Sequence, residues 1–272
     1  MMHAHFLAYQ EQQIHYCTWG NGSQLLIAIP GYADRAVNYG FLEKSMGQRH
    51  TIIAIDLPGH GNTQWDKAQF SPEDFIQIID KLLLTTGQRR FKLMGHSFGG
   101  RVVLALVQHF QKQIDFVYLL APDGLKPWDL KYSRLLPTFF RRLVGTLIGK
   151  PAPVLALATW LHRFSLLPTS SYRFLQVYLK TPTQRSRLIL FWNSLPAFRI
   201  KRPNLHGVWS ANDFSIAIIF GKDDQIIAPR LGKKVSEQWP QIDCYLIEGN
   251  HFILGETLAA QLKKIDKNLE SS

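Results

Sequence analysis

The stretch FKLMGHSFGGRVV, Phe91–Val103, joins an apolar run typical of a buried strand to an apolar pattern typical of a helix. Ser97 lies at the junction, between Gly95 and Gly99. In a sharp turn from strand to helix, glycines two residues before and after the serine keep side chains from colliding with the neighbouring backbone. Such a turn would lift the Ser97 hydroxyl above the carboxyl edge of a sheet. The alternative is a glycine-rich turn with a capping serine, because short motifs also match by chance.

Short apolar runs typical of buried parallel strands recur along the chain, at residues 24–30, 51–58, 91–95, 116–122, 215–221 and 243–249. Helical patterns lie between or after them, at residues 72–87, 230–240 and 256–270. This alternation predicts an α/β protein with a mostly parallel sheet and helices on both of its faces.

A serine hydroxyl becomes nucleophilic when a base takes its proton and an acid orients that base. The segment FGKDDQIIAP follows the predicted strand at 215–221 and offers Asp223 and Asp224. The segment EGNHFIL follows the predicted strand at 243–249 and offers His251. Each of these groups lies on a loop after a strand of the same direction, so the sequence predicts that they meet the serine at one edge of the sheet.

Five segments resemble the α/β-hydrolase family in their order along the chain: IPGYADR, DLPGHG, GHSFGG, GKDDQIIAP and GNHF. The resemblance covers almost all of the chain outside residues 123–212. It implies an eight-stranded type of sheet, with Ser97 as the nucleophile of the glycine-flanked turn. The family pattern G-x-x-D-x-[IV]-[IV]-x-P assigns the acid to Asp224, and the family's final histidine falls on His251.

The resemblance also implies an oxyanion hole formed by two backbone N–H groups, those of Tyr32 and Phe98. Losing one such donor typically lowers the rate by ~10²–10³. Family members often have His-Gly in the loop that holds the first donor, whereas this chain has Pro-Gly at 30–31. Some members carry their acid after the sixth strand, which makes Asp123 the alternative to Asp224.

Residues 123–212 contain no clear strand and are rich in Leu, Phe, Trp, Pro and Arg, which predicts several short helices. In this family such an insertion is a helical cap, here on an α/β-hydrolase core of residues 1–122 and 213–272. The interval has 14 Lys and Arg but only two acids, whereas the net charge of the whole chain is +11. An apolar, basic cap suits an apolar or amphiphilic ester, an anionic head group or a membrane surface. The alternative is a cap whose basic outer face is merely solvated.

Other classes of protein find little support in the sequence. The two cysteines, Cys17 and Cys244, are isolated and form neither a disulfide framework nor a metal motif, and neither a GxGxxG nor a P-loop motif occurs. We therefore expect no metal and no cofactor. The N-terminus lacks a signal-peptide pattern, and Lys150 with two prolines interrupts the most apolar stretch, 143–161, so we expect a cytoplasmic protein. Without a recognisable reading module, no nucleic acid partner is expected.

These observations predict a serine hydrolase that cleaves a carboxylic ester through an acyl-enzyme. A thioesterase and a carbon–carbon bond hydrolase of the same fold are the enzymatic alternatives, and a non-catalytic binding protein is the alternative from another class. Epoxide hydrolases and haloalkane dehalogenases of this fold use a carboxylate nucleophile, so Ser97 argues against both.

Overall fold

The computed structural model describes residues 1–125, 145–200, 206–207, 210 and 214–270. Contacts between residues divide the chain into two compact units. The core unit comprises Met1–Asp66, Pro72–Pro127 and Phe198–Ser272, and the second unit comprises Lys67–Ser71 and Trp128–Ala197. The predicted boundaries of a cap at 123 and 212 stay a prediction, and residues 126–144 of that interval lie outside the described residues.

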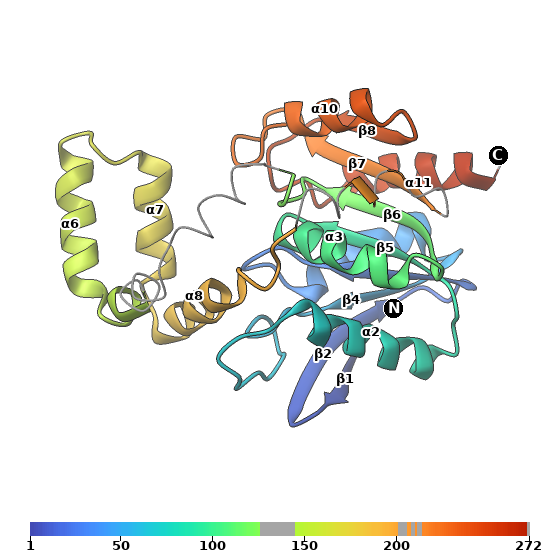
Figure 1. The fold of residues 1–272 in the computed structure, drawn as a ribbon, viewed down its shortest axis with the longest axis horizontal. Coiled ribbons are helices and arrows are strands. Elements are labelled where there is room, and N and C mark those ends of the chain that lie inside the picture. Colours follow the sequence, from blue (N-terminus) through green and yellow to red (C-terminus); the bar gives the residue numbers. More distant parts are fainter. Residues whose placement is uncertain (126–144, 201–205, 208–209, 211–213, 271–272) are drawn as a thin grey trace. The chain divides into compact units, whose positions relative to one another are not determined.

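The core unit is built on one eight-stranded sheet of order β1-β2-β4-β3-β5-β6-β7-β8 (Figure 1). Its strands are β1 His3–Tyr9, β2 Gln12–Trp19, β3 Gln24–Ile29, β4 His50–Ile55, β5 Phe91–His96, β6 Ile114–Leu120, β7 Ser215–Gly221 and β8 Ile242–Ile247. The first two strands form an antiparallel hairpin, and β2 is also antiparallel to β4, whereas all the other pairs are parallel. The predicted α/β class with a mostly parallel sheet is confirmed.

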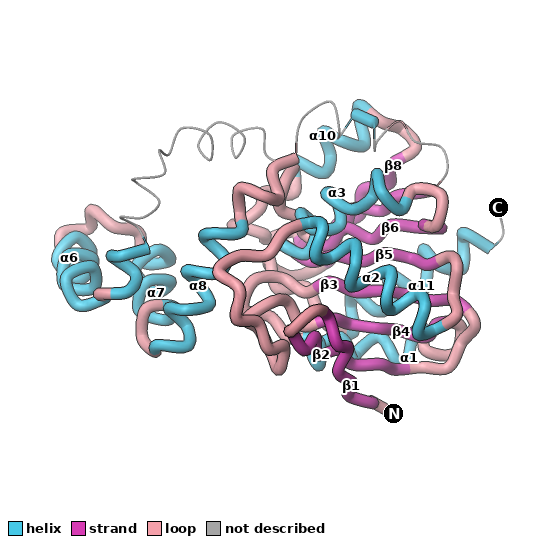
Figure 2. The backbone as a smooth tube through the Cα atoms, turned by 60° about the horizontal axis from the view of Figure 1, so that its bottom comes forward, coloured by secondary structure: helices cyan, strands magenta, loops and turns pink. Residues whose placement is uncertain are grey.

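Helices cover both faces of the sheet, as predicted. Figure 2 shows α2 (Pro72–Thr86), α3 (Phe98–Phe110) and α10 (Arg230–Gln238) on one side of the strands, with α1 (Glu43–Met46) and α11 (Glu256–Glu270) on the other. The short 3₁₀ helix η1 (Ala36–Leu42) leads into α1 and contacts α11.

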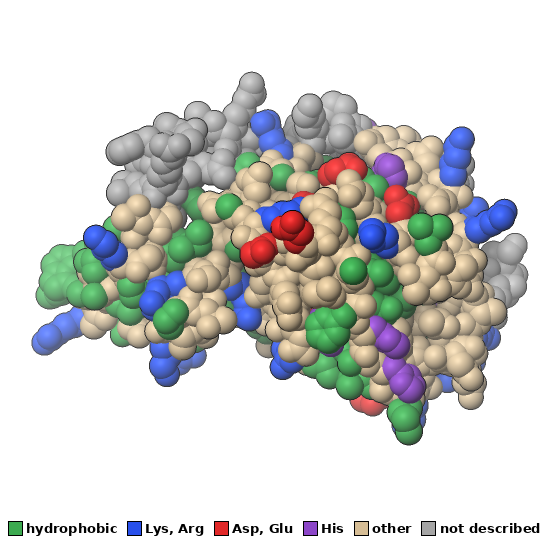
Figure 3. Space-filling view, turned by 90° about the horizontal axis from the view of Figure 1, so that it is seen from below, with side chains coloured by type: hydrophobic (Ala, Val, Ile, Leu, Met, Phe, Trp, Pro, Cys, Tyr) green, Lys and Arg blue, Asp and Glu red, His purple; other side chains and the backbone are tan. Residues whose placement is uncertain are grey.

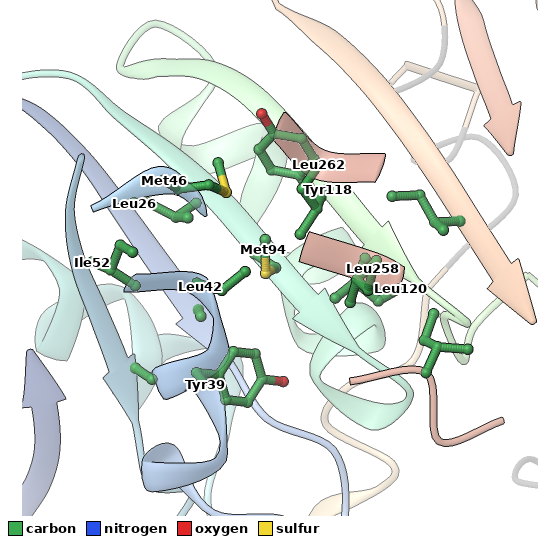
Figure 4. Close-up of a cluster of buried hydrophobic side chains, with 14 of the residues drawn as sticks. Leu26, Tyr39, Leu42, Met46, Ile52, Met94, Tyr118, Leu120, Leu258 and Leu262 are labelled. Atoms are coloured by element: carbon green, nitrogen blue, oxygen red, sulfur yellow. The ribbon is translucent and has the colours of Figure 1, made fainter. Parts of the chain in front are cut away.

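The face under η1, α1 and α11 is filled by one cluster of buried side chains (Figure 4). Alternate strand residues point into it because successive side chains of a strand face opposite ways. Members of the cluster that Figure 4 labels are Leu26, Tyr39, Leu42, Met46, Ile52, Met94, Tyr118, Leu120, Leu258 and Leu262. Each fully buried aliphatic side chain contributes roughly 1.5–3 kcal/mol, so this packing fixes α11 to the sheet.

A buried group of charged and polar side chains lies near the starts of β4 and β5, at the sheet edge opposite to Ser97. The Lys92 ammonium donates a hydrogen bond to the carboxylate of Asp266 on α11, and the Tyr118 hydroxyl donates to the same oxygen at 3.3 Å. His50 Nε2 lies 3.5 Å from that carboxylate oxygen. Burial lowers the pKa of His50 and raises that of Tyr118. These contacts tie the C-terminal helix to three strands, β4, β5 and β6.

The second unit contains the helices α6 (Pro151–Arg163), α7 (Thr169–Tyr178) and α8 (Pro182–Ser194). Thr181 begins α8 with a capping box in which its hydroxyl accepts from the N–H of Gln184. The segment Lys67–Ser71 belongs to this unit. Its hydrogen bonds with α8 include those from Phe70 N–H to Ser194 Oγ (2.9 Å) and from Asn193 Nδ2 to the Ala68 carbonyl (3.2 Å). Among the described residues, no helix has the length and apolarity that crossing a bilayer requires.

Candidate active site

Ser97 occupies the one-residue junction between β5 and α3, with φ 51° and ψ −116°. This left-handed backbone is rare for a residue with a side chain. The flanking glycines are required by space: a Cβ on Gly95 would lie 2.4 Å from the Gly99 carbonyl oxygen, and a Cβ on Gly99 would lie 2.0 Å from the Ile29 carbonyl oxygen. The structure therefore shows the sharp turn that the sequence predicts for this stretch.

The three predicted residues Ser97, His251 and Asp224 form a continuous chain of hydrogen bonds. His251 Nε2 lies 2.9 Å from Ser97 Oγ, and His251 Nδ1 lies 2.8 Å from Asp224 Oδ2. Because the carboxylate can only accept, Nδ1 carries the hydrogen and the lone pair of Nε2 faces the serine hydroxyl. This is the tautomer that a general base needs.

The carboxylate of Asp224 is held by its own loop. Its Oδ1 accepts hydrogen bonds from the N–H groups of Ile226 and Ile227, both at 2.8 Å, which leaves Oδ2 for His251. Asp224 and His251 are each 5% exposed, whereas Asp223 is exposed. Of the two adjacent acids, the structure therefore brings only Asp224 to the histidine.

Asp123, the alternative acid, is occupied elsewhere. Its carboxylate accepts two hydrogen bonds from the Arg101 guanidinium, at 2.9 Å from Nε and 3.0 Å from Nη2. Its backbone N–H donates to the Ser97 carbonyl at 2.8 Å. Arg101 lies on α3, one turn after the serine, so this ion pair ties the start of the helix to the loop after β6. No pattern in the sequence indicates this role for Arg101.

His96, next to the serine, points away from it and towards the histidine loop. Its Nε2 lies 3.0 Å from the backbone carbonyl oxygen of His251, so Nε2 donates and Nδ1 is the bare nitrogen. Burial lowers the pKa of His96 to about 4, which keeps the ring neutral. Nδ1 in turn lies 4.0 Å from Oδ2 of Asp34, a carboxyl whose pKa is raised by burial. No pattern in the sequence indicates this link.

The loop after β3 passes directly beside Ser97. Ile29 pairs with Gly95 in the sheet, and a Cβ on Gly31 would lie 3.2 Å from the Ser97 Cβ. The Asp34 N–H donates to the Gly31 carbonyl at 3.2 Å, which closes the turn that contains Tyr32. This is the position from which the predicted Tyr32 N–H would serve the oxyanion, together with the N–H of Phe98 at the start of α3.

Nothing in the described part of the chain forms a metal centre, since no group of three or more His, Cys, Asp or Glu side chains converges there. The two cysteines are free thiols. Burial raises the pKa of Cys244 to about 11, so this thiol is a poor nucleophile at neutral pH.

With this geometry in place, comparison with known proteins shows the family. Residues 24–257 match the family described as the alpha/beta hydrolase fold. The chain therefore belongs to the α/β-hydrolase family, and its fold supports a hydrolase.

The individual relatives are distant. An uncharacterized protein of Mycobacterium tuberculosis is 29% identical over 106 residues, which are 39% of this chain and 31% of that protein. N-formylmaleamate deformylase of Pseudomonas putida is 22% identical over 136 residues, 50% of this chain and 51% of that enzyme. The match thus spans about a third of the length of the first of these curated relatives and about half of the second.

Among solved structures, the thioesterase domain from the curacin biosynthetic pathway superposes with a TM-score of 0.69 at 19% identity, over 97% of this chain and 99% of that one. At this level of identity the likeness concerns the fold alone.

Proposed function

We propose that the protein is a serine hydrolase that cleaves a carboxylic ester through an acyl-enzyme. The observation that carries this proposal is the chain of two hydrogen bonds from Asp224 through His251 to Ser97, on a serine held in a left-handed turn. Nucleophile, base and orienting acid within hydrogen-bond reach are the arrangement by which serine hydrolases are recognised.

In the first half of the reaction, Ser97 Oγ attacks the ester carbonyl carbon as its proton passes to His251 Nε2. The tetrahedral oxyanion is stabilised by the N–H groups of Tyr32 and Phe98. The intermediate collapses when the bond to the alcohol oxygen breaks and His251 returns the proton to that oxygen. The products of this half are the free alcohol and an ester on Ser97.

In the second half, water attacks the acyl-enzyme carbonyl and gives a proton to His251 Nε2. Collapse of the second tetrahedral intermediate releases the carboxylic acid, and the proton returns to Ser97 Oγ. The Asp224 carboxylate keeps His251 in the required tautomer and stabilises the imidazolium that forms in each half.

For the substrate we propose a small-molecule ester that is apolar or amphiphilic. The apolar, acid-free composition of residues 145–197 supports this choice, because apolar side chains bind acyl groups and Lys or Arg side chains bind anionic head groups.

The test is hydrolysis of p-nitrophenyl esters from acetate to long acyl chains, with acyl-coenzyme A thioesters measured in parallel. We expect turnover by the wild type and a loss of about 10⁴-fold or more in Ser97→Ala, because removing the nucleophile leaves only binding and the oxyanion donors. The thermal unfolding of Ser97→Ala serves as the control for folding. A folded wild type without ester turnover would refute the ester proposal, and turnover of thioesters alone would assign the thioesterase alternative.

A further inference from the structure

Helix α6 is apolar on the side that faces its own unit and also on the side that faces away. Ala158 is buried, and α6 packs against α7. On the outer side, Leu157, Trp160 and Phe164 are 58%, 55% and 57% exposed. Their spacing of three and four residues places them on one face of the helix and its end. A helix that is apolar all round is typical of one that is covered on both sides.

This exposed face continues into the turn between α6 and α7, where Leu166 is 65% exposed. The rings of Trp160 and Phe164 lie 5.0 Å apart, so the aromatic side chains form a single surface. We call Leu157, Trp160, Phe164 and Leu166 the α6 stripe. In Figure 3, hydrophobic side chains gather at the end of the view where α6 and α7 lie, with Lys and Arg side chains around them.

The charge around the stripe has one sign. Residues 145–197 contain no Asp or Glu, and their basic residues are Lys150, Arg163, Arg173, Lys180, Arg185 and Arg187. Arg163 and Arg173, both exposed, precede and follow in the sequence the turn that carries Leu166. An apolar stripe containing Trp and Phe, flanked by cations without any acid, is complementary to an anionic lipid surface, whose head groups are negative and whose acyl region is apolar.

We propose that the α6 stripe inserts into the boundary between head groups and acyl chains of an anionic bilayer, with Arg163 and Arg173 contacting the lipid phosphates. A folded acidic protein would satisfy the cations but offers no general acyl phase for four exposed apolar side chains. This docking goes beyond ester cleavage, since it stands whether or not Ser97 acts on an ester.

The experiment is co-sedimentation of the full chain with vesicles of phosphatidylcholine alone and of phosphatidylcholine mixed with phosphatidylglycerol. We expect the wild type to bind the mixed vesicles, with binding that weakens as salt increases, and to bind phosphatidylcholine only weakly. The double variant Arg163→Gln/Arg173→Gln should bind the mixed vesicles roughly 25-fold less tightly, at about fivefold for each cation. The double variant Trp160→Ser/Phe164→Ser should lose at least tenfold.

Matched controls come from the core unit. Leu84→Ser removes an apolar side chain that is 82% exposed on α2, and Lys263→Gln/Lys264→Gln removes two exposed cations from α11. Both should bind vesicles as the wild type does. Ser97→Ala should also bind unchanged, which separates docking from catalysis.

Two outcomes would overturn the proposal. One is a wild type that does not prefer the anionic vesicles. The other is anionic binding that survives in Trp160→Ser/Phe164→Ser, because the stripe would then not insert. A rise in KM for a soluble ester in that same variant would then show that the stripe contacts substrate instead.

Discussion

Two carboxylates, Asp224 and Asp123, lie on loops at the same edge of the sheet, and they have different hydrogen-bond partners. Asp224 reaches the histidine, whereas Asp123 is held by Arg101. We predict that Asp224→Asn lowers kcat by about 10⁴-fold, because an amide no longer fixes the tautomer of His251. Asp123→Asn should change kcat by less than about tenfold and lower the free energy of unfolding, since it removes the carboxylate charge that accepts two hydrogen bonds from the buried Arg101 guanidinium. Steady-state kinetics and urea unfolding of both variants check this, and a larger kinetic loss in Asp123→Asn would reverse the assignment.

His96 is a positioning residue on this account, because its ring holds the backbone of His251 through one 3.0 Å hydrogen bond. His96→Leu removes the donor and should lower kcat roughly tenfold with little change in KM, the effect of about 1–1.5 kcal/mol for one hydrogen bond. His96→Gln retains an N–H near the same place and should recover most of that loss. Equal kcat values in the two variants, at equal thermal stability, would show that the hydrogen bond has no part in positioning the histidine.

For single residues, the sequence predicts those features that a short local motif requires. The turn at Ser97 can be predicted because it requires glycine on both sides within five residues. The links of Arg101 to Asp123 and of His96 to His251 join positions 22 and 155 residues apart, and neither end shows a pattern that announces its partner. Only the folded chain brings them together.

Among the elements, α3 depends most on a single position. A Cβ on Gly99 would approach the carbonyl oxygens of Ile29 and Pro30 at 2.0 and 2.6 Å, so α3 would have to move away from β3. We predict that Gly99→Ala lowers the free energy of unfolding by about 2–4 kcal/mol and abolishes turnover, because overpacking displaces the backbone that carries Ser97. Gly255→Ala is the matched control, since a Cβ there meets nothing within 4 Å. Chemical denaturation measures the free energy of unfolding of both variants. Equal values for Gly99→Ala and Gly255→Ala would contradict the close approach of α3 to β3.

The elements predicted from the sequence have a strong periodicity of apolar residues, or residues that clearly mark where the element begins or ends. The predicted helix 256–270 matches α11, and the predicted strands of the parallel sheet match β3 to β8 within a few residues. The hairpin of β1 and β2 was not predicted as a pair of sheet strands. β1 is mostly exposed along its length, so its sequence HAHFLAY carries only a weak alternation of apolar and polar residues.

For the molecule as a whole, neutral buried histidines make stability depend on pH. The unfolded chain takes up a proton on His96 near pH 6.5, whereas the folded chain does so only near a pKa of about 4. Stability is therefore lost as the pH falls through this window, and burial of His50 acts in the same direction. We predict that the free energy of unfolding decreases by about 2 kcal/mol or more between pH 7 and pH 5. Urea unfolding at pH 7 and at pH 5 measures this difference in the free energy of unfolding. The difference should be smaller in His96→Gln than in the wild type. Equal differences in the two proteins would contradict a buried neutral His96.

The second unit is made from two pieces of chain, the long insertion and the five residues Lys67–Ser71, which hydrogen bond to the end of α8. Because the unit is discontinuous in the sequence, it cannot be moved into another protein as one segment. A transplant of the long insertion alone would lose the two hydrogen bonds that join Ser194 and Asn193 to Phe70 and Ala68, and the recipient scaffold would supply an unrelated loop in that place. A working chimera therefore needs the long insertion and the segment Lys67–Ser71 to be exchanged together.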